Sequence, residues 1–106
     1  MGPRYMFPEG VGINKVHPYI IVANPTPAAA SLRVRYKLDT DPPYTPPHEE
    51  AFSVPPWGRF SYPIEAKGSN FWASVESMDN PDVRVVMSTW SEKYDGMPVI
   101  VNGIVW

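Results

Sequence analysis

The fold is decided by one short stretch, Ser31 to Leu38, which reads Ser-Leu-Arg-Val-Arg-Tyr-Lys-Leu. An apolar set alternates along it with a basic set, namely Leu32, Val34, Tyr36 and Leu38 against Arg33, Arg35 and Lys37. Side chains of a β-strand point alternately to the two faces of its sheet, so this period of two predicts a strand with one buried face. Such a strand indicates a packed antiparallel sheet around it.

Seven further segments have the character of short strands, and breaks rich in Pro, Gly and Asn separate them. They are Arg4 to Phe7, His17 to Asn24, Glu49 to Val54, Arg59 to Ile64, Phe71 to Met78, Val83 to Trp90 and Pro98 to Trp106. No stretch of comparable quality indicates a helix. The pattern predicts an all-β fold, an antiparallel β-sandwich of about eight strands, with a small barrel as the alternative. The 106 residues fit one domain over residues 1–106.

The breaks predict how neighbouring strands are joined. The turn Pro55 to Gly58 predicts a hairpin between the strands on either side of it, and the turn Met78 to Asp82 predicts a second hairpin. The proline-dense segment Asp39 to Pro47 predicts a stiff, exposed loop at one end of the sheet. The segment His17 to Asn24 is apolar on both faces, so we expect a central strand that is covered on both sides.

Composition limits the cysteine chemistry and the membrane association that the chain can have. It contains no cysteine, so a disulfide framework, a thiol nucleophile and a thiolate metal site are excluded. The first thirty residues hold no apolar core of a signal peptide, and no segment approaches the roughly 20 apolar residues of a membrane helix. We therefore expect no membrane insertion. The localisation stays unknown, whether cytoplasmic, in a virion, or secreted with the signal removed.

The titratable residues give little support for catalysis or for nucleic-acid binding. The two histidines, His17 and His48, lie in no nucleophile or metal motif, so we expect no enzyme activity, no cofactor and no metal. A net charge of −2 gives no general field that would attract phosphate, so no nucleic-acid partner is expected. The basic stripe of the alternating strand is expected to face water or to pair with acids on the neighbouring strand, Glu49 or Glu50.

Aromatic residues are the more informative surplus, with four tryptophans and six tyrosines in this small domain. Trp57 lies in a predicted turn, Tyr44 in the proline loop, and Trp72 on the strand face opposite Phe71. Exposed rings suit sugar stacking or docking on another protein. We predict a binding site made of Trp57, Tyr44 and Arg59 near one end of the sandwich, with Trp72 as a further binding residue. The alternative is that these rings cap the open ends of the fold.

A series of landmarks resembles the sensory rhodopsin transducer superfamily and related small bacterial β-sandwich modules. In order, they are Phe7-Pro8-Glu9-Gly10, Tyr19 to Ala23 running into Asn24-Pro25, Val54-Pro55-Pro56 ahead of Arg59, Val75-Glu76-Ser77, and Val83 to Val86 before an aromatic residue. The match spans about residues 5 to 90. The resemblance implies an antiparallel sandwich, no enzyme activity, symmetric oligomers and the binding of small molecules or sugars. The late strand departs from the family pattern, because Val86 to Thr89 replace a charged or polar pair.

Three residues within or beside these landmarks, Glu9, Asn24 and Trp90, are assigned structural roles. For Glu9 we expect an ion pair with Arg59 that links the first strand to the predicted central hairpin. Two functions from different classes follow from the sequence. The first is a non-enzymatic interaction module that self-associates or packs into a larger assembly, such as a virion or surface component. The alternative is a module that binds a small molecule or carbohydrate. The apolar C-terminal strand slightly favours assembly, because it needs a neighbouring chain or the first strand to cover it.

Overall fold

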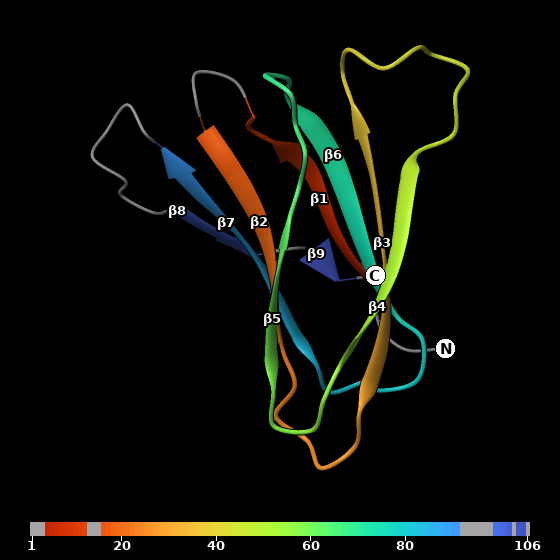
Figure 1. Ribbon diagram of the computed structural model, residues 1–106, viewed down its shortest axis with the longest axis vertical. Coiled ribbons are helices and arrows are strands. Elements are labelled where there is room, and N and C mark those ends of the chain that lie inside the picture. Colours follow the sequence, from red (N-terminus) through yellow and green to blue (C-terminus); the bar gives the residue numbers. More distant parts are fainter. Residues whose placement is uncertain (1–3, 13–15, 92–98, 103, 106) are drawn as a thin grey trace.

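The chain forms nine β-strands in a computed structural model that describes residues 4–12, 16–91, 99–102 and 104–105. The strands are β1 (Arg4–Gly10), β2 (Val16–Ala23), β3 (Ala30–Leu38), β4 (His48–Val54), β5 (Arg59–Pro63), β6 (Phe71–Ser77), β7 (Arg84–Ser91), β8 (Val99–Asn102) and β9 (Ile104–Val105). One antiparallel sheet has the order β4-β3-β6-β1-β9, and the other has the order β5-β2-β7-β8. We call them sheet A and sheet B. They face each other in Figure 1 and, over the described residues, do not close into a barrel.

The alternating strand behaves as its sequence predicts. The apolar side chains of β3 are buried, whereas its basic side chains are exposed or half-buried on the outer face of sheet A. The core between the sheets is filled by the inner faces of β1, β3 and β6 on one side and β2 and β7 on the other, including Phe7, Leu32, Val34, Phe71, Val75, Ile20, Val22, Val85 and Met87. The antiparallel sandwich is thus confirmed, and the buried apolar side chains of the described residues pack into a core between its sheets.

Both predicted hairpins are wrong. Strand β4 pairs with β3, and β5 pairs with β2, so the turn Pro55 to Gly58 crosses from sheet A to sheet B. In the same way β6 lies in sheet A and β7 in sheet B. A short turn with prolines or glycine reverses the direction of the chain. This reversal is needed both in a hairpin and in a crossing between packed sheets, so the turn residues do not distinguish the two. Strands that follow one another here lie mostly in different sheets, and the β3–β4 hairpin is joined by the proline loop.

The two ends of the sandwich have different characters. Residues 39–47 form the loop between β3 and β4 at one end, and Figure 1 shows it extending beyond the sheets. At the opposite end, which we call the turn end, the connections 24–29, 55–58 and 78–83 come together. Strand β2 lies between β5 and β7, as expected for a central strand. Its outer face is covered only in part, since Tyr19, Ile21 and Ala23 are half-buried.

The C-terminal segment divides between the sheets. Strand β8 pairs with β7 in sheet B, and β9 pairs with β1 in sheet A. The expected cover for the apolar C-terminal strand is therefore supplied partly by the first strand of the same chain. Pro98 and Trp106, the ends of the predicted strand, lie outside the described residues. The described part of the chain contains no helix that is long and apolar enough to cross a membrane.

Candidate functional site

The four residues predicted to bind a ligand do not come together. Tyr44 lies in the loop beyond β3, whereas Trp57 lies at the turn end, and β4 runs between them. The seven residues of β4, at about 3.3 Å each, place these two rings roughly 20 Å apart. Arg59 pairs with Ala23 in sheet B, and Trp72 pairs with Lys37 in sheet A. The predicted site of Trp57, Tyr44 and Arg59 at one end of the sandwich is thus wrong.

The three residues with predicted structural roles have different surroundings. Asn24 is buried, and its amide donates hydrogen bonds to the carbonyl of Ala28 at 2.7 Å and to that of Pro55 at 3.1 Å. Glu9 and Arg59 are exposed on strands of different sheets, and no ion pair joins them among the described residues. The expected pair is therefore absent, because the crossing turn places β5 in sheet B, whereas β1 lies in sheet A. The backbone of Trp90 pairs with His17, and its side chain is not described.

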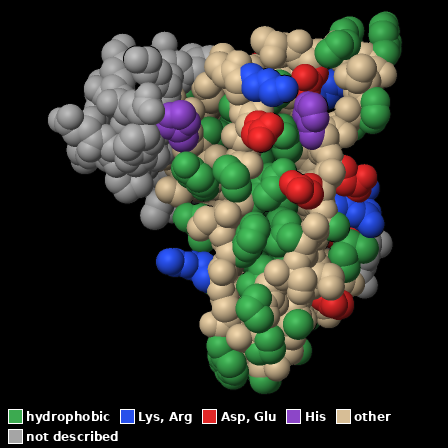
Figure 2. All heavy atoms as spheres, in the orientation of Figure 1, with side chains coloured by type: hydrophobic (Ala, Val, Ile, Leu, Met, Phe, Trp, Pro, Cys, Tyr) green, Lys and Arg blue, Asp and Glu red, His purple; other side chains and the backbone are tan. Residues whose placement is uncertain are grey.

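A hollow with aromatic walls lies between β4 and β5, which are edge strands of the two sheets. We call it the edge cleft. It encloses about 410 Å³ and is lined by Tyr36, Glu50, Phe52, Phe60, Tyr62, Pro63 and Glu65. A volume of this order lies within the roughly 300–1,000 Å³ range of small-molecule sites. Figure 2 shows hydrophobic side chains along the middle of this face, with acidic side chains beside them.

Strand register explains why these side chains meet. Glu50 and Phe52 pair with the buried residues Val34 and Leu32 of β3, so both occupy inner-face positions of sheet A. Phe60 and Tyr62 pair in the same way with Val22 and Ile20 of β2, so they occupy inner-face positions of sheet B. At these edges of the sandwich, no further strand of the described residues covers these positions. They remain partly open to solvent while pointing into the space between the sheets.

The aromatic wall is a stack of three rings contributed by both sheets. The ring of Phe52 lies 4.7 Å from that of Phe60 at an interplanar angle of 27°, and 5.8 Å from that of Tyr62 at 9°. Centroid distances of 4.5–7 Å are typical of favourable aromatic pairs. Phe60 is still 39% exposed. The stack therefore bridges the edges of the two sheets and keeps ring surface available at the mouth of the cleft.

Two carboxylates set the electrostatics of the edge cleft. Burial raises the pKa of the Tyr62 hydroxyl, and the hydrogen bond to Glu50 together with its negative charge raises it further. Burial also raises the pKa of Tyr36, with added contributions from the negative charges of Glu65, Glu50 and Asp41. Among the described residues that line the cleft there is no Lys, Arg or His side chain. The hollow therefore combines apolar ring faces with a negative potential.

A small polar cluster lies beside the aromatic wall, because His48 pairs with Tyr36 and shares the inner face of β4 with Glu50 and Phe52. The ring of His48 stacks on that of Tyr36 with centroids 4.8 Å apart, and its Nε2 atom lies 3.0 Å from Oδ2 of Asp41. The same carboxylate oxygen accepts a hydrogen bond from the backbone N–H of Leu38 at 3.0 Å. That backbone hydrogen bond and the bond to His48 lower the pKa of Asp41. The cluster fixes the start of the 39–47 loop against β4 and holds the Tyr36 ring in place.

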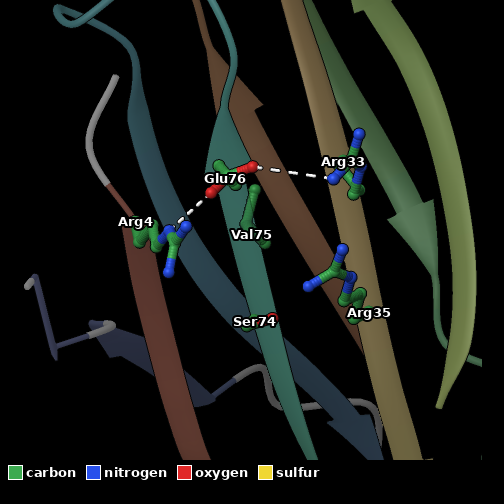
Figure 3. Close-up of a pocket in the computed structure, with 6 residues that line it drawn as sticks. All are labelled: Arg4, Arg33, Arg35, Ser74, Val75 and Glu76. Atoms are coloured by element: carbon green, nitrogen blue, oxygen red, sulfur yellow. Dashed lines mark hydrogen bonds and ion pairs between the residues drawn. The ribbon is translucent and has the colours of Figure 1, made fainter. Parts of the chain in front are cut away.

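A second surface, the outer face of sheet A, is charged, and its arginines form ion pairs with acids on neighbouring strands. Arg4 and Arg33 both approach Glu76, as Figure 3 shows. The Nε atoms of Arg33 and Arg35 lie 3.1 Å and 3.0 Å from the carboxylate of Glu49. The prediction that the basic stripe pairs with acids on a neighbouring strand is confirmed for Glu49. The hollow between these side chains encloses only about 80 Å³, which is small for an organic ligand.

The residues of the edge cleft were not predicted from the sequence, although one signal for them was present. In Glu49 to Val54 the alternation places Glu50 on the same face as Phe52 and Val54. A carboxylate in that position is unusual on an inner face, because burying an unpaired charge is costly. The described residues also contain no group of three or more His, Cys, Asp or Glu side chains that would hold a metal ion.

Comparisons with known proteins inform the fold and not the site. No family model matches the chain, and no curated protein matches it in sequence. The structure is similar to the crystal structure of Thermotoga maritima 1070, with a TM-score of 0.76 over 97% of this chain and 93% of that chain. The two sequences are 16% identical. A likeness at this level supports the sandwich fold and says nothing of the ligand.

Proposed function

We propose that this domain is a non-enzymatic binding module and that the edge cleft is its ligand site. The observation that carries the proposal is that Phe52, Phe60 and Tyr62, at inner-face positions, line an open hollow of about 410 Å³. Rigid rings provide contact area at a low cost in side-chain entropy, and a few polar groups among them orient a ligand. The carboxylates of Glu50 and Glu65 supply those polar groups.

Self-association, as a homo-oligomer or within a larger assembly, is a second proposal. It is supported by the outer face of sheet B, where Ile21 and Val86 pair across β2 and β7 and, like Tyr19, are only half-buried. An apolar sheet face of this kind suits contact with another protein. The sequence favoured assembly because an unpaired C-terminal strand would need a cover. In the structure β8 pairs with β7 and β9 pairs with β1, so this reason for assembly is weaker and we place ligand binding first.

Membership of the sensory rhodopsin transducer superfamily also remains a proposal. It is supported by the order of the sequence landmarks and by the antiparallel sandwich that the resemblance implies. Binding of small molecules or sugars, which the resemblance also implies, agrees with an aromatic cleft, because sugar rings stack well on flat aromatic faces. Trp57 is one of the binding residues predicted from the sequence, and its ring is exposed. It serves as the comparison outside the cleft in the test below.

The test of the binding proposal is an NMR titration of the whole chain with a panel of neutral sugars, alcohols and amines. We expect at least one class to shift the ring resonances of Phe52, Phe60 and Tyr62 in a saturable way. Phe60→Leu keeps an apolar side chain but removes a ring face, so it should weaken that binding. Trp57→Ala is the matched comparison outside the cleft and should leave the binding unchanged. The proposal fails if no compound shifts the cleft resonances, or if only Trp57→Ala affects them. Light scattering over a range of concentrations tests self-association separately.

A further inference from the structure

We infer that the ligand of the edge cleft is a small alkylated organic cation, such as a quaternary ammonium compound. The inference deepens the binding proposal above and rests on it. It follows from a combination that neither a sugar site nor a plain apolar groove requires. Several aromatic faces lie next to carboxylates, and the described residues of the lining include no basic side chain.

The rings provide the surface that an alkylated cation needs. A cation over the face of a Tyr, Phe or Trp ring is attracted by the negative face of the π-system, and this contact strengthens when water is partly excluded. The edge cleft offers rings from Tyr36, Phe52, Phe60 and Tyr62. Methyl groups on the cation also pack against these rings as apolar surface, so a single ligand satisfies both the apolar and the charged part of the site.

The carboxylates provide charge complementarity. Glu50 lies on β4, and Glu65 lies in the segment that follows β5, so the two negative charges come from different segments of the cleft lining. Both carboxylates raise the pKa values of Tyr36 and Tyr62, which places their negative field at the aromatic wall. Two basic side chains close to these carboxylates in sequence have other neighbours. His48 lies next to Glu50 along the inner face of β4, where its Nε2 atom is hydrogen-bonded to Asp41, and Lys67 borders the neighbouring hollow that Glu65 also lines.

Glu50 has a competing explanation as a guard against edge pairing. A charged residue that points inward on an edge strand discourages other chains from adding a strand there. That explanation accounts for one carboxylate but not for the ring stack or for Glu65. It also makes a different prediction, because removal of the charge should then raise the oligomeric mass and leave ligand binding unaffected.

The test compares choline with 3,3-dimethylbutan-1-ol, its neutral counterpart of nearly the same shape, by NMR titration of the whole chain. We expect choline to shift the cleft resonances and to bind about tenfold more tightly than the neutral alcohol. Glu50→Gln and Glu65→Gln combined should weaken choline binding by about tenfold and leave the weak binding of the alcohol unchanged. Glu49→Gln is the matched control, since it removes one charge from β4 on the opposite face of the strand. It should change choline affinity by less than about twofold.

Several outcomes would overturn the inference. Equal affinity for choline and the alcohol would show that the charge is irrelevant, and unchanged choline binding in the double variant would exclude the carboxylates. A larger mass by light scattering for Glu50→Gln, with choline affinity kept, would assign Glu50 to edge protection instead. If the alcohol or a sugar shifts the cleft resonances while choline does not, the cation class fails and the binding proposal stands. If no probe shifts them, both fail.

Discussion

Replacing Asn24 with Ala would remove the side chain that joins the connections of the turn end. Asn24 is 1% exposed, and its side chain makes six contacts within hydrogen-bond distance. The Nδ2 group donates to the carbonyls of Ala28, Val54 and Pro55 at 2.7, 3.3 and 3.1 Å. The Oδ1 atom accepts from the N–H and the hydroxyl of Thr26 at 3.2 and 2.7 Å, and from Nδ2 of Asn80 at 3.4 Å. One amide therefore connects segments 24–29, 55–58 and 78–83.

The expected loss of stability follows from the capacity of that amide. It has two N–H donors and an oxygen with two lone pairs, so about four of these contacts act as full hydrogen bonds. At about 1 kcal/mol each the loss is about 4 kcal/mol. Water reaches the exposed residue Ala28 and replaces part of what is removed, so we expect a loss of about 2–4 kcal/mol for Asn24→Ala. That is a large fraction of the roughly 5–15 kcal/mol that stabilises an ordinary domain.

Urea unfolding followed by circular dichroism measures this loss. With a slope of about 1.5 kcal/mol per molar urea, a loss of 3 kcal/mol lowers the midpoint by about 2 M. Asn70→Ala is the matched control, because Oδ1 of Asn70 accepts one long bond from the Gly12 N–H at 3.3 Å. It should cost less than about 1 kcal/mol. The reasoning is refuted if Asn24→Ala lowers the midpoint no more than Asn70→Ala does.

Two further substitutions test the strain at Trp57 and the titration of Tyr62. Trp57 has a φ of 59° in a turn closed by the bond from the Gly58 N–H to the Pro55 carbonyl. Trp57→Gly should therefore raise the urea midpoint by the equivalent of about 0.5–1 kcal/mol, and Trp57→Ala, which keeps the strain, should not. The pKa of Tyr62 is raised above 10.0 in the folded chain, so its proton stabilises the fold below pH 10 and this contribution is lost as the pH rises above that value. Tyr62→Phe should lose less stability than the native chain between about pH 9 and pH 11, and parallel losses would contradict the assignment.

Sequence patterns predicted those parts of the fold that depend on local information. The alternation in Ser31 to Leu38 gave the strand, its buried face and the basic outer stripe. Proline, glycine and asparagine gave the breaks, and strand bounds differ from the predicted ones by a residue or so in most elements. In β1 the strand continues through Pro8 to Gly10, where the sequence suggested an end. Gly10 still pairs with Phe71 of β6, after an irregularity in the register between Phe7 and Gly10. Proline is tolerated at such irregularities because the regular backbone hydrogen bonding is interrupted there.

The parts that failed depend on long-range pairing. Tyr44 and Trp57 were grouped because both are aromatic residues in breaks between strands, but a strand separates them in space. The Glu9–Arg59 pair relied on a hairpin that does not form. The network around Asn24 joins segments about 30 and 56 residues apart in sequence, and no local pattern encodes such contacts. A sequence period reports which face of a strand is buried, but not which strand lies beside it.

The incorrectly predicted hairpin and the candidate site have the same physical origin. In a hairpin, the strands flanking Pro55 to Gly58 would pair within one sheet, and their inner faces would lie side by side against the core. Because the turn crosses instead between the sheets, Phe52 and Phe60 face each other across the gap at the sandwich edge and stack at 4.7 Å. An edge of this kind has no next strand to cover it, so rings and carboxylates from both sheets border one open hollow. The crossing turn is therefore the feature that turns two ordinary edge strands into the two walls of a binding cleft.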